Sequence, residues 1–183
     1  MLCIFRAQNS ALSGEIMTKK ANVRLLIACL LGFLAGLAAM VIAYPFIFPP
    51  PILNQKLIHA ETKTLIAKGN FIHPNPKDFI HYGKGSVNVY KAKRQYEIFL
   101  NKDFKVGPGP AFHIFLSDTK NIKTNTDFKN SKKYDLGMLK SFQGSQIYSI
   151  PSHVNLSEIK SVVIWCASFS QLITSADLKK STL

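Results

Sequence analysis

The stretch "SVVIWCASFS", Ser161 to Ser170, decides the fold class of this chain. In a strand, side chains alternate between two faces, so Val162, Ile164 and Cys166 share one face. The other face carries Val163, Trp165, Ala167 and Phe169. Because both faces are apolar, the stretch is typical of a central strand that other elements cover on both sides.

Runs of the same character recur along the second two-thirds of the chain. They are rich in β-branched and aromatic residues, and clusters such as "HPNP", "YGKG" and "VGPGP" separate them. The runs are "KTLIAKGNFI", "GSVNVYK", "QYEIFLN", "AFHIFLSD" and "QIYSI". Many short strands at close spacing predict an all-β domain, built either as a β-sandwich or as a closed, barrel-like sheet.

An apolar run, Leu25 to Tyr44, precedes this domain and contains no charge. A helix of that length, at about 1.5 Å per residue, crosses the roughly 30 Å hydrocarbon core of a bilayer. We expect Pro45 and Pro49–Pro51 to end the helix. A cleaved signal peptide is the alternative, but its apolar region is usually shorter, and "AYPFIFPPP" places bulky residues at the cleavage position. The sequence therefore favours one uncleaved transmembrane anchor over residues 25–44, in contact with membrane lipid.

The segment before this run decides the predicted topology. It holds four basic side chains and one acidic side chain: Arg6, Lys19, Lys20, Arg24 and Glu15. The positive-inside rule then predicts a cytoplasmic leader over residues 1–24, and it places the β domain in the periplasm or outside the cell, tethered to the inner membrane. Met17 begins a compact leader, "MTKKANVRLL", and we expect it to be the true start.

Composition divides the remainder of the chain into a Pro-rich linker and spacer at 45–63, the β domain at 64–178 and a tail at 179–183. The formal net charge is +13. In a tethered domain, anionic lipid, cell-wall polymer or solubility explains that charge better than nucleic acid does, so no nucleic-acid partner is predicted. The lysine-rich stretch Asp118 to Lys133 is typical of a polar, mobile loop.

Patterns of known catalytic and metal sites are missing from the sequence. It contains no C-x-x-C, no paired-cysteine zinc spacing and no G-x-S-x-G. His73, Asp78 and His81 are close enough in sequence to join a metal site, but loop histidines of this kind are more often structural, and we predict no metal. A conventional enzyme is not expected of the isolated domain, because no acid, base and nucleophile come together.

Several motifs follow one another in order between Leu65 and Leu178. "GPAFHIFLS" at Gly109–Ser117 is followed by "DLGMLKSFQGSQIYSIP", by "SVVIWCASFS" and by "SADL". In this order they resemble the DM-thirteen domain, also called the electron-transfer DM domain, a family found beside DOMON domains. The resemblance implies an all-β domain with a role in electron transfer. Ala111 departs from the pattern, because the family more often has a polar or acidic residue there.

Cys166 matches the cysteine of that family. The resemblance implies that it acts as a redox-active free thiol or as the ligand of a prosthetic group, for which haem is a candidate. His113 and His81 are the family-matched histidines, and we expect them near Cys166 as a second ligand or as partners of a thiolate. Cys3 and Cys29 lie before or within the span, so neither is expected to pair with Cys166.

Two functions therefore remain open. The first is an envelope redox or electron-transfer module that works with a redox partner protein through Cys166. The second is a non-catalytic binding or adhesion domain, in which Cys166 packs in the core as a small hydrophobic residue.

Overall fold

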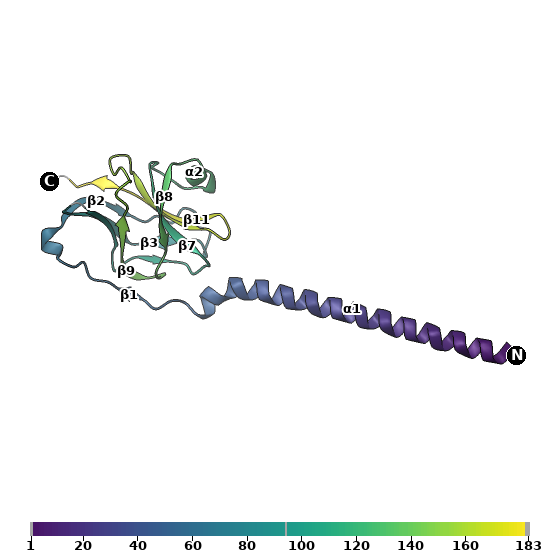
Figure 1. The fold of residues 1–183 in the computed structure, drawn as a ribbon. Helices are drawn as coiled ribbons and strands as arrows, with labels where there is room; N and C mark the ends of the chain where they lie inside the picture. Colours follow the sequence, from purple (N-terminus) through teal and green to yellow (C-terminus); the bar gives the residue numbers. More distant parts are fainter. Residues whose placement is uncertain (1, 94, 182–183) are drawn as a thin grey trace. The chain divides into compact units, whose positions relative to one another are not determined.

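The computed structural model describes residues 2–93 and 95–181, with side chains from Asn22 onward (Figure 1). The chain divides into two compact units, Met1–Ala43 and Tyr44–Leu183. Helix α1 covers Leu2–Ile47. In the described part of the chain, its segment Asn22–Ile47 is the one helix long and apolar enough to cross a membrane. The predicted anchor at 25–44 lies within this segment.

The end of α1 differs from the expectation, because the helix passes through Pro45 and ends at Ile47. Proline lacks an N–H, so in the last turn it removes only one backbone hydrogen bond. The N–H of Phe48 still donates to the carbonyl of Tyr44 at 2.8 Å and closes that turn. The prediction that Pro45 stops the helix was therefore wrong by one turn.

The second unit is all-β, as predicted. Its larger sheet has the strand order β1-β9-β5-β4-β2-β12, its smaller sheet has the order β11-β10-β7-β8, and β3 pairs separately with β6. The bounds are β1 Leu53–Asn54, β2 Thr64–Asn70, β3 Gly83–Lys84, β4 Ser86–Ala92, β5 Gln95–Leu100, β6 Lys105–Val106, β7 Phe112–Ser117, β8 Lys133–Met138, β9 Gly144–Ile150, β10 Ser161–Cys166, β11 Gln171–Asp177 and β12 Lys179–Lys180. Both large sheets end in unpaired edge strands among the described residues, so the domain is a β-sandwich and not a closed barrel.

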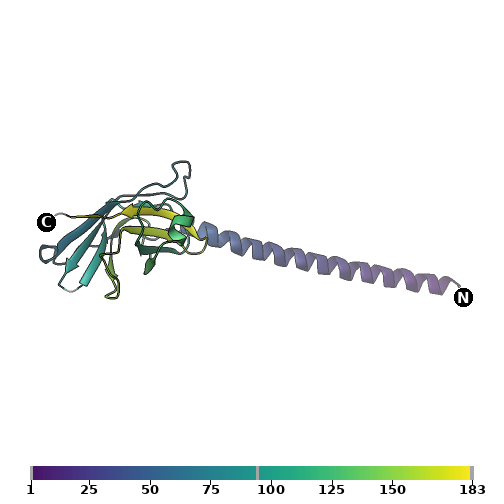
Figure 2. The same cartoon turned by 90° about the horizontal axis from the view of Figure 1, so that it is seen from above.

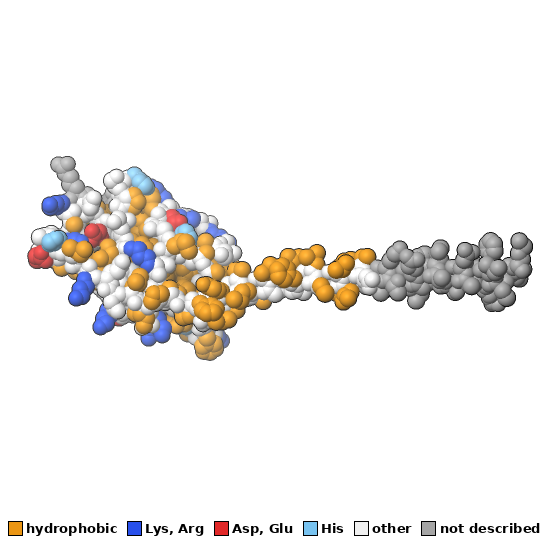
Figure 3. Space-filling view, turned by 60° about the horizontal axis from the view of Figure 1, so that its bottom comes forward, with side chains coloured by type: hydrophobic (Ala, Val, Ile, Leu, Met, Phe, Trp, Pro, Cys, Tyr) orange, Lys and Arg blue, Asp and Glu red, His pale blue; other side chains and the backbone are white. Residues whose placement is uncertain are grey.

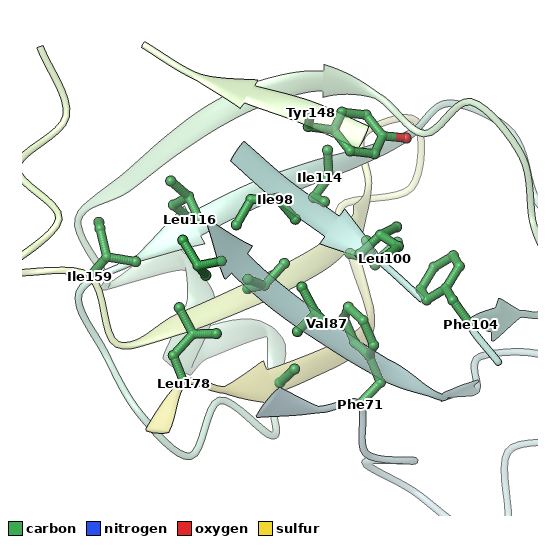
Figure 4. Packing of buried hydrophobic residues seen from close by; sticks show 14 of the residues in the cluster. Phe71, Val87, Ile98, Leu100, Phe104, Ile114, Leu116, Tyr148, Ile159 and Leu178 are labelled. Carbon is green, nitrogen blue, oxygen red and sulfur yellow. The ribbon is translucent and has the colours of Figure 1, made fainter. Parts of the chain in front are cut away.

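One apolar core lies between the two sheets, because alternate residues of their strands point inward. Val87 and Val89 of β4 come from the larger sheet and Ile114 and Leu116 of β7 from the smaller sheet, and each is at most 1 % exposed. Figure 4 shows this packing, with Ile159 and Leu178 at one end of the labelled cluster and Phe104 at the other. This core also contains Val162, Ile164 and Cys166, which confirms that they share one face. The strand ends at Cys166, however, so Ala167 and Phe169 lie exposed in the turn after it and not on the other buried face.

A second apolar cluster covers the outer face of the smaller sheet. It contains Ile122, Phe128, Val163, Trp165 and Leu172. The first two residues come from the lysine-rich stretch, in which helix α2, Asn125–Lys129, forms. In Figure 2 this short green helix lies beside the yellow strand β11.

The expectation of a polar, mobile loop over 118–133 was therefore wrong. The Thr124 hydroxyl accepts a hydrogen bond from the Asp127 N–H, and the Asp127 carboxylate accepts one from the Thr124 N–H, a capping box that fixes the start of α2. Phe128 is 2 % exposed and packs against Trp165, with 4.6 Å between the ring centroids. Two apolar residues in a polar stretch are enough to fold it onto the sheet.

All six strand-like runs of the sequence form strands, namely β2, β4, β5, β7, β9 and β10. The smaller sheet also contains β8 and β11, which the sequence reading did not single out. The sheets extend past the segment 64–178, because β1 lies in the expected linker and pairs with β9, and β12 lies in the expected tail and pairs with β2. The spacer at 55–63 contains a single 3-10 turn, Ala60–Thr62.

Candidate functional site at the end of β10

Cys166 is the last residue of β10, and its side chain points into the core between the sheets. It pairs with Phe112 of β7 on one side and with Gln171 of β11 on the other. The residue is 2 % exposed, and its Sγ donates a hydrogen bond to the carbonyl oxygen of Pro110 at 3.1 Å. The thiol therefore lies directly under one backbone carbonyl group.

The segment 107–111, "GPGPA", forms a closure over this thiol, and we call it the thiol loop. Neither of its two glycine positions leaves room for a side chain. A Cβ atom at Gly107 would lie 2.1 Å from the carbonyl oxygen of Ile80, and one at Gly109 would lie 2.5 Å from the ring of Phe112. The Gly-Pro run, which the sequence marks as a separator between strands, is therefore a closely packed part of the domain.

Two residues near the thiol have a left-handed backbone conformation. Ala111 has a φ of 48° and Ser170 has a φ of 49°. A left-handed residue with a Cβ costs roughly 1–2 kcal/mol. The carbonyl of Ala111 nevertheless accepts a hydrogen bond from the N–H of Ala167 at 3.0 Å, which ties the thiol loop to the turn that follows Cys166. Asp and Asn tolerate this conformation better than Ala does, so a polar residue at position 111 has a conformational reason.

His113 lies on the opposite face of the smaller sheet from Cys166. It pairs with Trp165, the neighbour of Cys166, and strand side chains alternate, so His113 and Trp165 share the outer face. There its Nδ1 lies 2.9 Å from the Asp135 carboxylate, and its ring stacks on Phe115. The expected approach of His113 to Cys166 does not occur in this structure. Asp135 was not singled out from the sequence.

His81 lies in the loop before β3, where Asp78 organises the backbone. The Asp78 carboxylate accepts hydrogen bonds from the N–H groups of Ile80 and His81, and it lies 2.7 Å from Nδ1 of His81. The hydrogen bond from the His81 N–H is the largest influence that lowers the pKa of Asp78 below its usual value. His81 also lines a cavity of about 300 Å³ with Gln171, the β11 partner of Cys166.

The sequence group His73, Asp78 and His81 comes together as a folded loop. Nε2 of His73 lies 2.8 Å from the backbone carbonyl of Asp78, not from its carboxylate. Among the residues that the structure describes, no group of three or more His, Cys, Asp or Glu side chains could hold a metal ion. These contacts stabilise the loop, which is the structural role considered for the two histidines.

Haem does not fit Cys166 in this arrangement. An axial thiolate needs a free sulfur lone pair that faces a ligand cavity. Here the side chain is almost fully buried among core residues, and its sulfur contacts the Pro110 carbonyl. The matched histidine on the adjacent strand, His113, faces the other side of the sheet. What the site offers chemically is one buried thiol beneath one tightly packed loop.

Comparison with known proteins gives one match. The family model described as "Electron transfer DM13" matches residues 77–178. The matched region runs from the loop that contains Asp78 to the end of β11 and includes Cys166, His113 and the thiol loop. No curated protein and no solved structure matches the chain.

Proposed function

The chain belongs to the Electron transfer DM13 family, and from that premise we propose that its β domain is an electron-transfer module in which Cys166 is the reacting group. The observation that carries this proposal is the position of Cys166. It is the only cysteine in the matched region, and it lies at a strand end under a single loop. A reactive thiol needs a route to its partner, and the thiol loop is the segment whose carbonyl group contacts the sulfur.

The chemistry that fits a lone thiol is exchange with a disulfide of a partner protein. The Cys166 thiolate attacks one sulfur of an acceptor disulfide, forms a mixed disulfide, and releases the other sulfur as a thiolate that takes up a proton. One thiolate of a donor dithiol then attacks the Cys166 sulfur and releases the reduced acceptor. The donor's second thiolate frees Cys166 as the donor disulfide closes. Two electrons have then passed from donor to acceptor.

The thiol loop acts as the gate in this proposal. In the closed state the thiol is buried and donates a hydrogen bond to the Pro110 carbonyl, so a partner disulfide cannot reach it. Opening the loop breaks that hydrogen bond and the one between Ala167 and Ala111, and it relieves the left-handed conformation of Ala111. The left-handed conformation of Ala111 raises the free energy of the closed loop, and this lowers the cost of opening it.

The setting proposed for this module is the outer side of the inner membrane, with α1 as a single-pass anchor in contact with lipid. The support is the long apolar segment Asn22–Ile47 and the basic residues Lys19, Lys20 and Arg24 that precede or begin it. In an oxidising compartment an exposed lone thiol is readily oxidised or mispaired. Burial of Cys166 in the closed state protects the thiol from such oxidation and mispairing.

A second function, a non-catalytic binding domain of the cell envelope, has its own support. Cys166 is 2 % exposed and belongs to the main core cluster, as a packing residue would. In that case the domain presents its loops or cavities to a ligand, and the thiol takes no part.

The two functions separate in a disulfide-exchange experiment on the full chain in lipid nanodiscs. Cys3 and Cys29 are both replaced by Ser, so that Cys166 is the only thiol, and oxidised glutathione is added under native conditions. We expect one glutathione per chain by mass spectrometry, released again by a dithiol, and none in the same chain carrying Cys166→Ala. A chain that takes up glutathione only after denaturation refutes the electron-transfer proposal. A Soret band between about 400 and 450 nm in the natural chain refutes the free-thiol route in favour of haem.

A further inference from the structure

A groove of about 760 Å³ opens at the end of the sandwich away from Cys166. It lies where the chain crosses from β11 of the smaller sheet to β12 of the larger sheet. The N–H of Leu178 there donates to the carbonyl of Lys160 at 2.8 Å. The floor of the groove is apolar and is formed by Ile66, Ala67, Val89, Tyr96, Leu156, Ile159 and Leu178. Most of these residues belong to the main core cluster or pack on it, so the groove is an opening into the core.

The rim of the groove is basic. Five lysines line it: Lys91, Lys120, Lys160, Lys179 and Lys180. All five are exposed, and no acidic residue lines the groove. Among the described residues, no carboxylate lies within salt-bridge distance of any of them.

Four acidic residues lie within two residues of a groove residue in the sequence, and each has a hydrogen-bond partner that is not a rim lysine: Glu97, Asp118, Glu158 and Asp177. Glu158 lies in the segment that forms one wall, but its carboxylate accepts a hydrogen bond from Nζ of Lys132 at 2.9 Å and one from Asn155. The hydrogen bond from Lys132 is the main cause that lowers the pKa of Glu158, and no salt bridge joins this carboxylate to a rim lysine among the described residues. The face drawn in Figure 3 likewise carries more basic than acidic side chains.

An apolar floor beneath a rim of one charge sign selects an amphiphile of the opposite sign. Burial of a hydrocarbon chain becomes more favourable with each CH₂ group, and lysines without a carboxylate partner attract a negative head group. The volume lies within the range of about 300–1,000 Å³ that is usual for sites of single small ligands. We propose that this groove binds a long-chain carboxylate, with its chain on the floor between the sheets and its head group among Lys160, Lys179 and Lys180.

This site is separate from the thiol site. Residues Ser161 and Cys166 are the two ends of β10, and a strand rises about 3.3 Å per residue, so about 16 Å of strand separates the groove from the thiol. The inference does not depend on the redox chemistry of Cys166, and it holds for either function proposed above.

Photo-crosslinking tests the proposal on the full chain in nanodiscs of zwitterionic phosphatidylcholine. The probe is hexadecanoate with a diazirine near the end of its chain, and the cross-linked peptides are identified by mass spectrometry. We expect label on the peptides that contain Ile66, Leu156 and Leu178. Unlabelled hexadecanoate should compete for this label, whereas hexadecyltrimethylammonium and butanoate should not.

Charge variants test the role of the rim. Replacing Lys160, Lys179 and Lys180 together by Gln should weaken competition by hexadecanoate about tenfold, as expected when three exposed ion pairs are lost. The matched control replaces three exposed lysines away from the groove, Lys77, Lys102 and Lys129, and should leave competition unchanged. The paired variant Ile66→Asn and Leu156→Asn should reduce labelling while the lysines remain.

Each contrary result has a distinct meaning. Label spread evenly over the domain, or an equal effect of both lysine triples, overturns the assignment of the site. Equal competition by the cationic surfactant overturns the role of charge. Competition by butanoate or polyphosphate as strong as that by hexadecanoate overturns the amphiphile in favour of a polyanion. If the Ile66→Asn and Leu156→Asn variant does not fold, the lysine variants and the competing ligands still test whether the groove binds the carboxylate.

Discussion

The two ends of the sandwich core differ in how closely they are packed: one end is closed by a loop, and the other opens into a groove. At the Cys166 end, the thiol loop packs so closely that neither of its glycines leaves room for a Cβ, and the thiol contacts a carbonyl group. At the other end, Ile159 and Leu178 border an open groove surrounded by lysines. The contrast shows that the first end is closed over a buried thiol, whereas the second end leaves apolar surface accessible beside its lysines.

The largest difference is expected from one substitution made at both ends. Ile164 is 0 % exposed and lies two residues before the thiol, whereas Ile159 is 8 % exposed beside the groove. Ile164→Ala should lower the free energy of unfolding by about 4 kcal/mol, and Ile159→Ala by about 2 kcal/mol, because a site next to a groove leaves a smaller sealed cavity. Equal losses in denaturant-induced unfolding would contradict the contrast between a closed end and an open end.

A smaller effect is expected from Gly109→Ala in the thiol loop. The added methyl group meets the Phe112 ring and forces the loop or the ring to move, which should cost about 2 kcal/mol. Labelling of Cys166 by a thiol reagent in native buffer should become faster, because the closed loop is selectively destabilised. Loss of stability with unchanged labelling would show that the loop does not control access to the thiol.

The loop that contains Asp78 should respond to acid locally. Its carboxyl has a lowered pKa in the folded state, so it contributes stability above its unfolded value of 3.8, and that contribution is lost as the pH falls through the lower folded value. Hydrogen exchange at the N–H groups of Ile80 and His81 should therefore accelerate below about pH 4. Asp78→Asn, which keeps an acceptor oxygen but no charge, should abolish this pH dependence. Protection that is the same in both proteins down to pH 2 would contradict it.

The smallest effect is expected from relief of strain at position 111. Ala111→Gly removes the Cβ that a left-handed residue accommodates poorly, and it should stabilise the closed loop by less than about 1 kcal/mol, since the unfolded chain also gains freedom. The measurement is thermal unfolding together with the rate of Cys166 labelling, which should fall. Faster labelling would show that the strain of Ala111 does not help the loop to open.

The strands could be predicted from the sequence because their β-branched and aromatic residues recur in short runs bounded by Gly and Pro. Strand β8, "KYDLGM", was missed because it mixes charged and apolar residues, none of them fully buried, and lies at an edge of its sheet. The cover formed by α2 was missed because composition averages a polar stretch and hides the two buried residues that fix it, Ile122 and Phe128.

The candidate site was predicted in part. The sequence singled out Cys166 and indicated a single strand over the stretch 161–170, whereas the structure ends that strand at Cys166. The expected approach of His113 depended on register, which sequence does not give. Phe112 is the residue opposite Cys166, and a shift of one residue moves a side chain to the other face. Family motifs give the order of residues along the chain, but they do not show which face of a sheet each side chain occupies.

The most direct test of the gated thiol is the denaturant dependence of Cys166 labelling in the full chain that carries Cys3→Ser and Cys29→Ser. If the thiol loop opens locally, labelling in native buffer occurs far faster than global unfolding allows, and its rate barely changes with low urea concentrations. If Cys166 is only a packing residue, labelling follows global unfolding, and its rate rises with urea with the full slope of the unfolding transition. The account predicts the first result, and the second would contradict it.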